Sequence, residues 1–163
     1  MRKLIVATAP LLATALQSPI AASDTAQALV GSWKLTSYKV QFVGEDVIEP
    51  FGPRAKGALA VTDSGRWMVM LTGGDRQIAT NDAERAQLLG SMIAWTGRFT
   101  VEGDKVTSKV DASWNELYTG QLETQVRFVK MDGDTLSLRS PEMESAVRPG
   151  KRAVATLTFV RER

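Results

Sequence analysis

The feature of this sequence that most restricts its fold is a series of short stretches in which apolar and polar residues alternate. Segments 29–43 and 152–161 are the first and the last of them. Alternation with a period of two is typical of a strand with one buried face. Turn signals such as Asp63-Ser64-Gly65 and Asp132-Gly133 separate the stretches. The chain is therefore predicted to be all-β, with about eight or nine short antiparallel strands that hairpins connect into an up-and-down barrel.

The first strand contains a glycine next to a tryptophan, Gly31-Ser32-Trp33. Strict alternation places Trp33 and Leu35 on one face and Tyr38 on the other. A glycine beside a large ring suggests that the ring is tucked under neighbouring backbone, where only a hydrogen atom fits. We therefore predict structural roles for Gly31 and Trp33, with the later strands wrapping around this one.

One short helix is predicted to interrupt the strands. Asn81 is a good N-cap, and Glu84 follows at the spacing of a capping box. Apolar residues then recur at helical spacing, at Ala83, Ala86, Leu89 and Ile93. The preceding strand, 66–72, is apolar on both faces, so we predict that the helix covers Met68 and Met70. A lid or a partner-binding face is the alternative role for this helix.

The first 22 residues are predicted to be a secretory signal peptide. A basic start, Met1-Arg2-Lys3, precedes a short apolar stretch and small residues at the exit. The stretch is shorter than the roughly 20 apolar residues that a membrane span needs. We expect cleavage after Ala22 or Ser23, a tether over 23–28 and one domain over 29–163, located in the periplasm or secreted. A retained anchor helix is the alternative, whereas cleavage leaves no stable membrane insertion.

Composition excludes several classes of chemistry. The chain has no cysteine and no histidine, which excludes disulfides, thiol nucleophiles, a Ser-His-Asp triad and histidine-ligated metal or haem. Loss of Arg2 and Lys3 with the leader takes the formal charge of +2 to zero, and the remaining basic residues form no long run. We therefore predict no nucleic-acid partner, no metal and no cofactor.

Several motifs occur in a fixed order along the chain: Leu-Val-Gly-Ser-Trp-Lys-Leu-Thr-Ser-Tyr at 29–38, Pro-Phe-Gly at 50–52, Gly57, Thr-Asp-Ser-Gly at 62–65, Ile-Ala-Trp-Thr-Gly-Arg-Phe-Thr-Val at 93–101, Arg127-Phe128, Asp-Gly-Asp-Thr-Leu-Ser-Leu at 132–138 and Leu157-x-Phe159-x-Arg161. This ordered set resembles the bacterial and fungal lipocalin-like domain family. The resemblance covers residues 29–161 and includes the Gly-x-Trp of lipocalins. It departs at 107–109, where relatives often carry histidine and this chain reads Thr-Ser-Lys.

The resemblance implies a small barrel whose interior can hold an apolar molecule. By analogy with lipocalins, Trp33 would close the floor of the barrel and Arg161 would lie across its ring. Cavities for small ligands are mostly apolar and aromatic. The residues that we predict to contact a ligand are Trp67, Val69, Trp95, Phe99, Trp114, Tyr118 and Phe128.

The four indole and phenol residues of this list fall into two pairs with different expected roles. Trp67 and Trp95 could simply fill the barrel, because side chains alone fill an interior of about eight strands. Trp114 and Tyr118 lie in a predicted loop, where we expect them to line the mouth of the barrel.

The function predicted from these features is that of an exported protein that binds a small hydrophobic molecule. One alternative is an isomerase or cyclase acting on a lipophilic substrate through a carboxylate with a raised pKa. Its candidate residues are Asp111, Glu116, Glu123, Arg98 and Arg127. Their spacing matches no acid–base motif, and alternation puts Glu123 and Arg127 on the face opposite Phe128, so we expect a solvated exterior and predict no catalytic residue. The other alternative is a periplasmic interaction or inhibitor barrel that uses loops 114–120 or 141–150.

Overall fold

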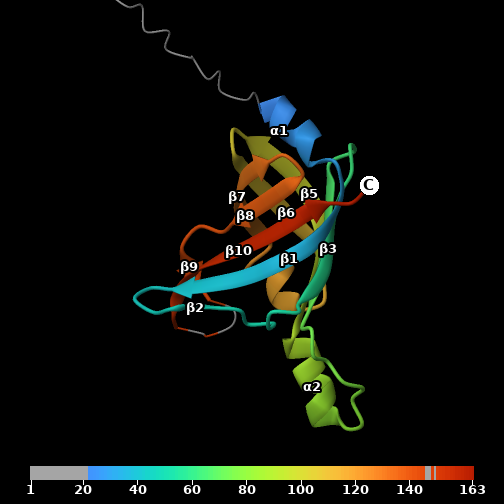
Figure 1. Ribbon diagram of the computed structural model, residues 1–163, viewed down its shortest axis with the longest axis vertical. Coiled ribbons are helices and arrows are strands. Elements are labelled where there is room, and N and C mark those ends of the chain that lie inside the picture. The colour runs from blue at the N-terminus through green and yellow to red at the C-terminus, as the bar shows by residue number, and fades with distance from the viewer. Residues whose placement is uncertain (1–21, 146–147, 149) are drawn as a thin grey trace, which may run out of the picture.

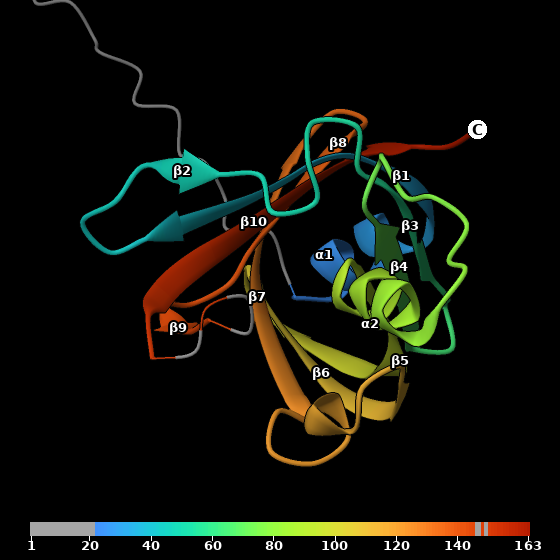
Figure 2. The same ribbon diagram turned by 90° about the horizontal axis from the view of Figure 1, so that it is seen from below.

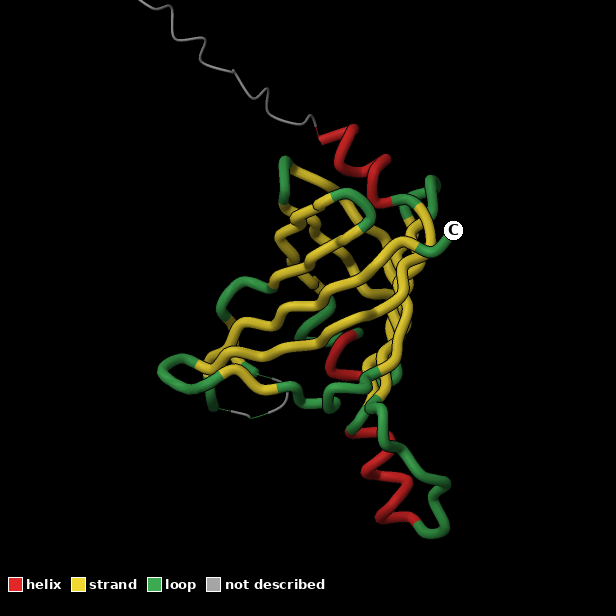
Figure 3. Tube along the Cα trace, viewed as in Figure 1, coloured by secondary structure: helices red, strands yellow, loops and turns green. Residues whose placement is uncertain are grey.

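The computed structural model describes residues 22–145, 148 and 150–163. The predicted signal peptide falls almost entirely outside these residues. Within them, eight antiparallel strands follow one another around a closed barrel (Figures 1 and 3). These are β1 (Gly31–Phe42), β3 (Lys56–Val61), β4 (Arg66–Thr72), β5 (Met92–Glu102), β6 (Lys105–Ser113), β7 (Thr124–Asp132), β8 (Thr135–Arg139) and β10 (Arg152–Arg161). Pairing of β1 with β10 closes the barrel, which confirms the predicted fold class.

Two short strands extend the barrel at one end. Strand β2 (Val47–Ile48) pairs with the end of β1, and β9 (Met143–Glu144) pairs with the start of β10. No helix in the described part of the chain has the length and the apolar character that crossing a membrane requires.

The inward face of β1 changes phase at a β-bulge. The register of β1 against β10 shifts between Leu35 and Ser37, because a bulge inserts one extra residue into a strand. Trp33 and Leu35 therefore point inward before the bulge, and Tyr38 points inward after it, with 7% of its surface exposed. The prediction that Tyr38 faces outward is wrong for this reason.

Strand β7 also faces the opposite way from the prediction. Its inward residues are Gln125, Arg127, Val129 and Met131. Directly opposed residues of antiparallel strands share a face, and Gln125 is opposed to Ser108 while Val129 is opposed to Leu138. Ser108 and Leu138 are both buried, with 2% of each exposed. The neighbouring strands thus turn Arg127 inward and leave Phe128 on the outer face.

Helix α1 (Ala22–Leu29) and the buried Trp33 close one end of the barrel. The helix contains the segment predicted as a tether and lies over this end (Figure 1). Trp33 is fully buried, and its Nε1 donates a hydrogen bond of 2.9 Å to the carbonyl oxygen of Leu29. The guanidinium carbon of Arg161 lies 4.0 Å from the centroid of the Trp33 ring. A cation–π interaction of this kind contributes about 0.5–2 kcal/mol to the stability of the folded state.

Gly31 makes room for this arrangement. Its φ is +134°, and a Cβ atom there would lie 2.8 Å from Nη1 of Arg161. The same guanidinium donates hydrogen bonds of 2.9 Å to the carbonyl oxygen of Val30 and 2.6 Å to that of Ala28. Carbonyl groups at the end of a helix lack partners within it, so Arg161 ties α1 to the closed end of the barrel.

Helix α2 (Asp82–Gly90) begins as predicted but does not cover the sheet. The side chain of Asn81 accepts a hydrogen bond of 3.0 Å from the backbone N–H of Glu84. The helix extends away from the barrel (Figure 1) and contains no buried residue. Met68 and Met70 are 47% and 53% exposed, so the predicted cover is wrong. Strands β4 and β5 pair directly up to Thr72, which leaves α2 beyond the rim.

Candidate ligand-binding cavity

A cavity of about 90 Å³ lies inside the barrel toward the end opposite α1, the end from which Figure 2 is viewed. Apart from two tryptophans, its apolar lining comes from β1, β4, β5, β8, β9 and β10 and from the segment before β7: Val40, Val69, Leu71, Ile93, Leu122, Leu138, Met143, Ala153, Ala155, Leu157 and Phe159. Pockets for small molecules usually measure roughly 300–1,000 Å³. The present cavity therefore suits only a small or slender molecule in this conformation.

Two tryptophans form an aromatic wall of this cavity. The rings of Trp67 and Trp95 are nearly parallel, at 8°, with centroids 6.4 Å apart. They come from the paired strands β4 and β5. Trp67 is directly opposed to Gly97, which lies two residues after Trp95, so the two rings are diagonal neighbours on the same face. Trp67 is 2% exposed, and its Nε1 has no hydrogen-bond partner within the described ranges. The wall is thus apolar apart from its indole N–H groups, of which the buried one of Trp67 is unused.

Arg127 brings a positive charge into the same cavity. It is mostly buried and lines the cavity from β7. Its Nη1 donates a 2.7 Å hydrogen bond to the carbonyl oxygen of Val126, and its Nη2 donates a 3.1 Å hydrogen bond to Oε1 of Gln125. Gln125 is 3% exposed, and its own Nε2 donates to the carbonyl oxygen of Leu122 at 2.7 Å. The amide of Gln125 therefore holds the guanidinium in place.

Two phenols share the cavity with Arg127. Tyr38 and Tyr118 are 7% and 9% exposed and both line the cavity. The pKa of Tyr38 is raised to about 12, chiefly by burial and also by the neighbouring Tyr118, whereas the positive charge of Arg127 acts to lower it. Burial likewise raises the pKa of Tyr118, again against the effect of Arg127. Both phenols therefore stay protonated at neutral pH and can donate hydrogen bonds.

The predicted ligand contacts divide into two groups. Trp67, Val69, Trp95 and Tyr118 line the cavity. Phe99 instead lies behind the wall, with its ring edge-on to Trp67 at 5.9 Å. Trp114 packs on Tyr118 at 4.7 Å between ring centroids and lies outside the cavity lining.

Phe128 requires a correction, and it reveals what the sequence-based site missed. Phe128 is 37% exposed on the outer face of β7, because the register of that strand turns its odd-numbered residues inward. The same register brings in Gln125 and Arg127, and the bulge in β1 brings in Tyr38. None of these three residues belonged to the predicted ligand contacts, although Arg127 was a candidate residue of the enzyme alternative.

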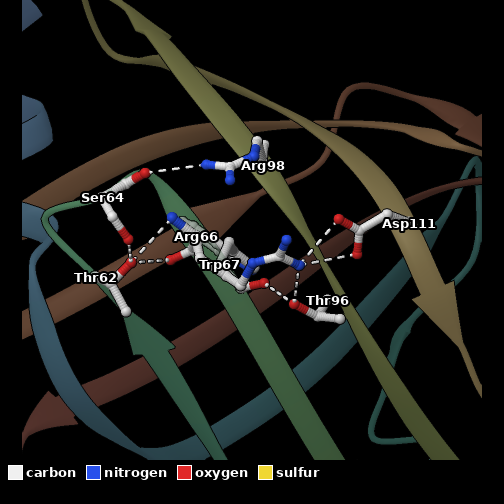
Figure 4. Close-up of polar contacts among 7 residues, drawn as sticks. All are labelled: Thr62, Ser64, Arg66, Trp67, Thr96, Arg98 and Asp111. Atoms are coloured by element: carbon white, nitrogen blue, oxygen red, sulfur yellow. Dashed lines mark hydrogen bonds and ion pairs between the residues drawn. The ribbon is translucent and has the colours of Figure 1, made fainter.

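The carboxylates considered for acid–base catalysis lie elsewhere. Asp111 forms an ion pair of 2.9 Å with Arg66, which also donates to Thr96 at 3.2 Å (Figure 4). Arg98 donates to the carbonyl oxygen of Ser64 at 3.2 Å. Every Asp and Glu of the described residues keeps exposed surface.

The other two carboxylates form surface contacts. Glu123 pairs with Lys109 at 3.7 Å, and both side chains are substantially exposed. Glu116 is exposed and accepts a hydrogen bond of 2.9 Å from Thr119. The described part of the chain contains no group of three or more His, Cys, Asp or Glu that could hold a metal ion. Arg127 is thus the member of the catalytic candidate set that reaches the cavity.

Comparison with family models identifies the type of domain. The family model described as a lipocalin-like domain matches residues 30–162. A solved structure of EF1p2_mFAP2b bound to DFHBI is 14% identical, with 89% of this chain and 100% of that chain covered and a TM-score of 0.47. An uncharacterized protein from Bacteroides eggerthii is 13% identical, with 82% and 98% covered and a TM-score of 0.40. Comparison with curated proteins gives no match.

Proposed function

The chain belongs to the lipocalin-like domain family, and we propose that it binds a small molecule with a slender apolar body inside the barrel. The observation that carries this proposal is the cavity itself, which is lined by apolar and aromatic side chains and lies away from the end that α1 and Trp33 fill. Burial of apolar surface drives such binding, and a few polar groups orient the ligand.

We also propose that the protein acts outside the cytoplasm. The proposal rests on the basic start, the apolar stretch and the small residues that precede residue 23. Sequencing the amino terminus of the protein recovered from its host tests this. A mature chain that starts at Ser23 or Asp24 is expected, and a chain that retains Met1 would contradict export by cleavage.

A series of neutral primary alcohols from 1-butanol to 1-octanol tests the binding function. Each additional methylene buried in the cavity contributes about 0.8 kcal/mol, or roughly a fourfold decrease in Kd. We expect this decrease at each step until the cavity of about 90 Å³ and its opening are full. Isothermal titration calorimetry measures the Kd of each alcohol.

A matched pair of variants shows whether the alcohols occupy the cavity. Ala155→Phe fills the space, because Ala155 lines the cavity, and it should abolish binding. Ala112→Phe makes the same change at an exposed position of β6 and should leave the Kd unchanged. Binding that is insensitive to chain length, or equal in the two variants, would refute the proposed function.

A further inference from the structure

We propose that the natural ligand carries one carboxylate group, which pairs with Arg127 and accepts hydrogen bonds from Tyr38 and Tyr118. This inference rests on the proposed function and specifies the class of ligand, an aliphatic or otherwise slender carboxylic acid. Its basis is a positive charge without a counterion and two hydroxyl groups without a hydrogen-bond partner among the described residues, all of which line one largely apolar cavity.

The charge of Arg127 has no counterion in the described structure. Arg127 forms no ion pair with any described residue, and its two hydrogen bonds go to neutral oxygens, those of Val126 and Gln125. The residues outside the described ranges contain no Asp or Glu. Buried charges in proteins are normally paired, because removing a charge from water is costly. A ligand carboxylate would supply the missing partner.

Glu144, the other charged residue of the cavity lining, does not act as a counterion for Arg127. Glu144 lies in β9 beside the start of β10, and it is exposed to solvent. Its Oε1 accepts a hydrogen bond of 2.9 Å from the backbone N–H of Gly150. The interior of the cavity therefore carries the single positive charge of Arg127.

The two phenols are also unused. Neither Tyr38 nor Tyr118 forms a hydrogen bond through its hydroxyl group to another described residue, although each is at least nine-tenths buried. Both phenols line the same cavity as Arg127, and its positive charge acts on the ionisation of each. Because burial keeps them protonated, both hydroxyl groups donate at neutral pH and thus suit an acceptor such as a carboxylate.

The chemistry of the three groups favours a carboxylate over other anions. A guanidinium presents parallel N–H groups that match the two oxygens of a carboxylate, and Arg127 uses two of its five N–H groups within the protein. A dianionic phosphate monoester would leave one negative charge unpaired beside a single cation. The apolar remainder of the cavity accommodates the hydrocarbon part of the acid.

Three probes with the same six-carbon chain test the head group in the wild-type protein: hexanoate, 1-hexanol and hexylphosphate. Hydrogen bonds to a charged group are the stronger class, so hexanoate should bind about tenfold to hundredfold more tightly than 1-hexanol. Hexylphosphate should bind less tightly than hexanoate. Isothermal titration calorimetry near neutral pH measures the three values of Kd.

Variants assign the preference to its residues. In Arg127→Met the ratio between hexanoate and 1-hexanol should fall to about one while the Kd of 1-hexanol is kept. Arg139→Met removes an exposed arginine of β8 and should keep the ratio. Tyr118→Phe removes one hydroxyl donor without a change of charge, and it should reduce the ratio several-fold even if Arg127→Met fails to fold.

The outcomes separate the two proposals. Equal binding of 1-hexanol and hexanoate would overturn the carboxylate assignment and leave the proposed function standing. Tighter binding of hexylphosphate than of hexanoate would have the same consequence. A preference for hexanoate that persists in folded Arg127→Met would overturn the role of Arg127. Failure of all three probes to bind the wild-type protein would remove both proposals.

Discussion

Replacement of Trp33 by alanine is expected to lower the free energy of unfolding by about 3–5 kcal/mol, the range for truncation of a large buried aromatic residue. Trp33 is fully buried at the closed end of the barrel. The neighbouring strands hold their positions, so the space that the missing ring leaves cannot close. The same change removes the 2.9 Å hydrogen bond to Leu29 and the ring beneath Arg161. Urea denaturation followed by circular dichroism measures the loss.

Trp33→Phe is the control for this variant. Phenylalanine keeps an aromatic ring below the guanidinium of Arg161 but cannot donate to the carbonyl oxygen of Leu29. A smaller loss, about 1–2 kcal/mol, is expected from the missing hydrogen bond and the smaller ring. A loss below 1 kcal/mol in Trp33→Ala would show that the contacts of Trp33 with Leu29 and Arg161 do not stabilise the barrel.

The stability of the protein is expected to fall as the pH rises from about 10 to about 12 because of the buried phenols. The pKa of Tyr38 is about 12 in the folded protein, against 10.0 for an exposed tyrosine. The folded state therefore holds the phenolic proton more tightly than the unfolded state does. This contribution is fully present below pH 10 and is lost as the pH rises through 12, by about 3 kcal/mol for Tyr38.

Two measurements check this expectation. The chain has two tyrosines, Tyr38 and Tyr118, so its tyrosinate absorbance reports on the cavity alone. The protein in urea should ionise near pH 10, and the native protein should ionise at higher pH. Comparison of urea denaturation between the wild type and Tyr38→Phe isolates the share of Tyr38, because the other ionisable groups are common to both. An ordinary step near pH 10 in the native protein would contradict the burial of these phenols.

Part of the cavity could be predicted from the sequence because two of its strands alternate without interruption. Strands β4 and β5 place Trp67, Val69 and Trp95 on one face in a simple period of two, and the structure turns that face inward. The side chains on the other face of β4 include Met68 and Met70, which are apolar but exposed. Apolar character alone therefore did not decide which face required a cover.

The polar part of the cavity was missed because it depends on the phase of strands relative to one another. The turn Asp132-Gly133 contained a signal for the direction in which the side chains of β7 point. The structure opposes Asp132 to Thr135 across this turn, and this register opposes Met131 to Leu136. Counting back by twos from Met131 along β7 leads to Arg127 and Gln125, so the inward phase of Leu136 predicts their position. For β1, the apolar positions change from odd to even numbers between Leu35 and Tyr38, which is the pattern that a bulge produces.

Turn chemistry and the period of alternation are properties of neighbouring residues, so the strands, the hairpins, the cap at Asn81 and the barrel class follow from the residues alone. The direction in which each strand faces, the path of α2 away from the sheet and the meeting of Arg127 with Tyr38 and Tyr118 depend on the register between strands. One extra residue in a strand reverses every side chain that follows it. Closure of β1 against β10 fixes these phases together, and the cavity with its single buried charge exists only once that closure is made.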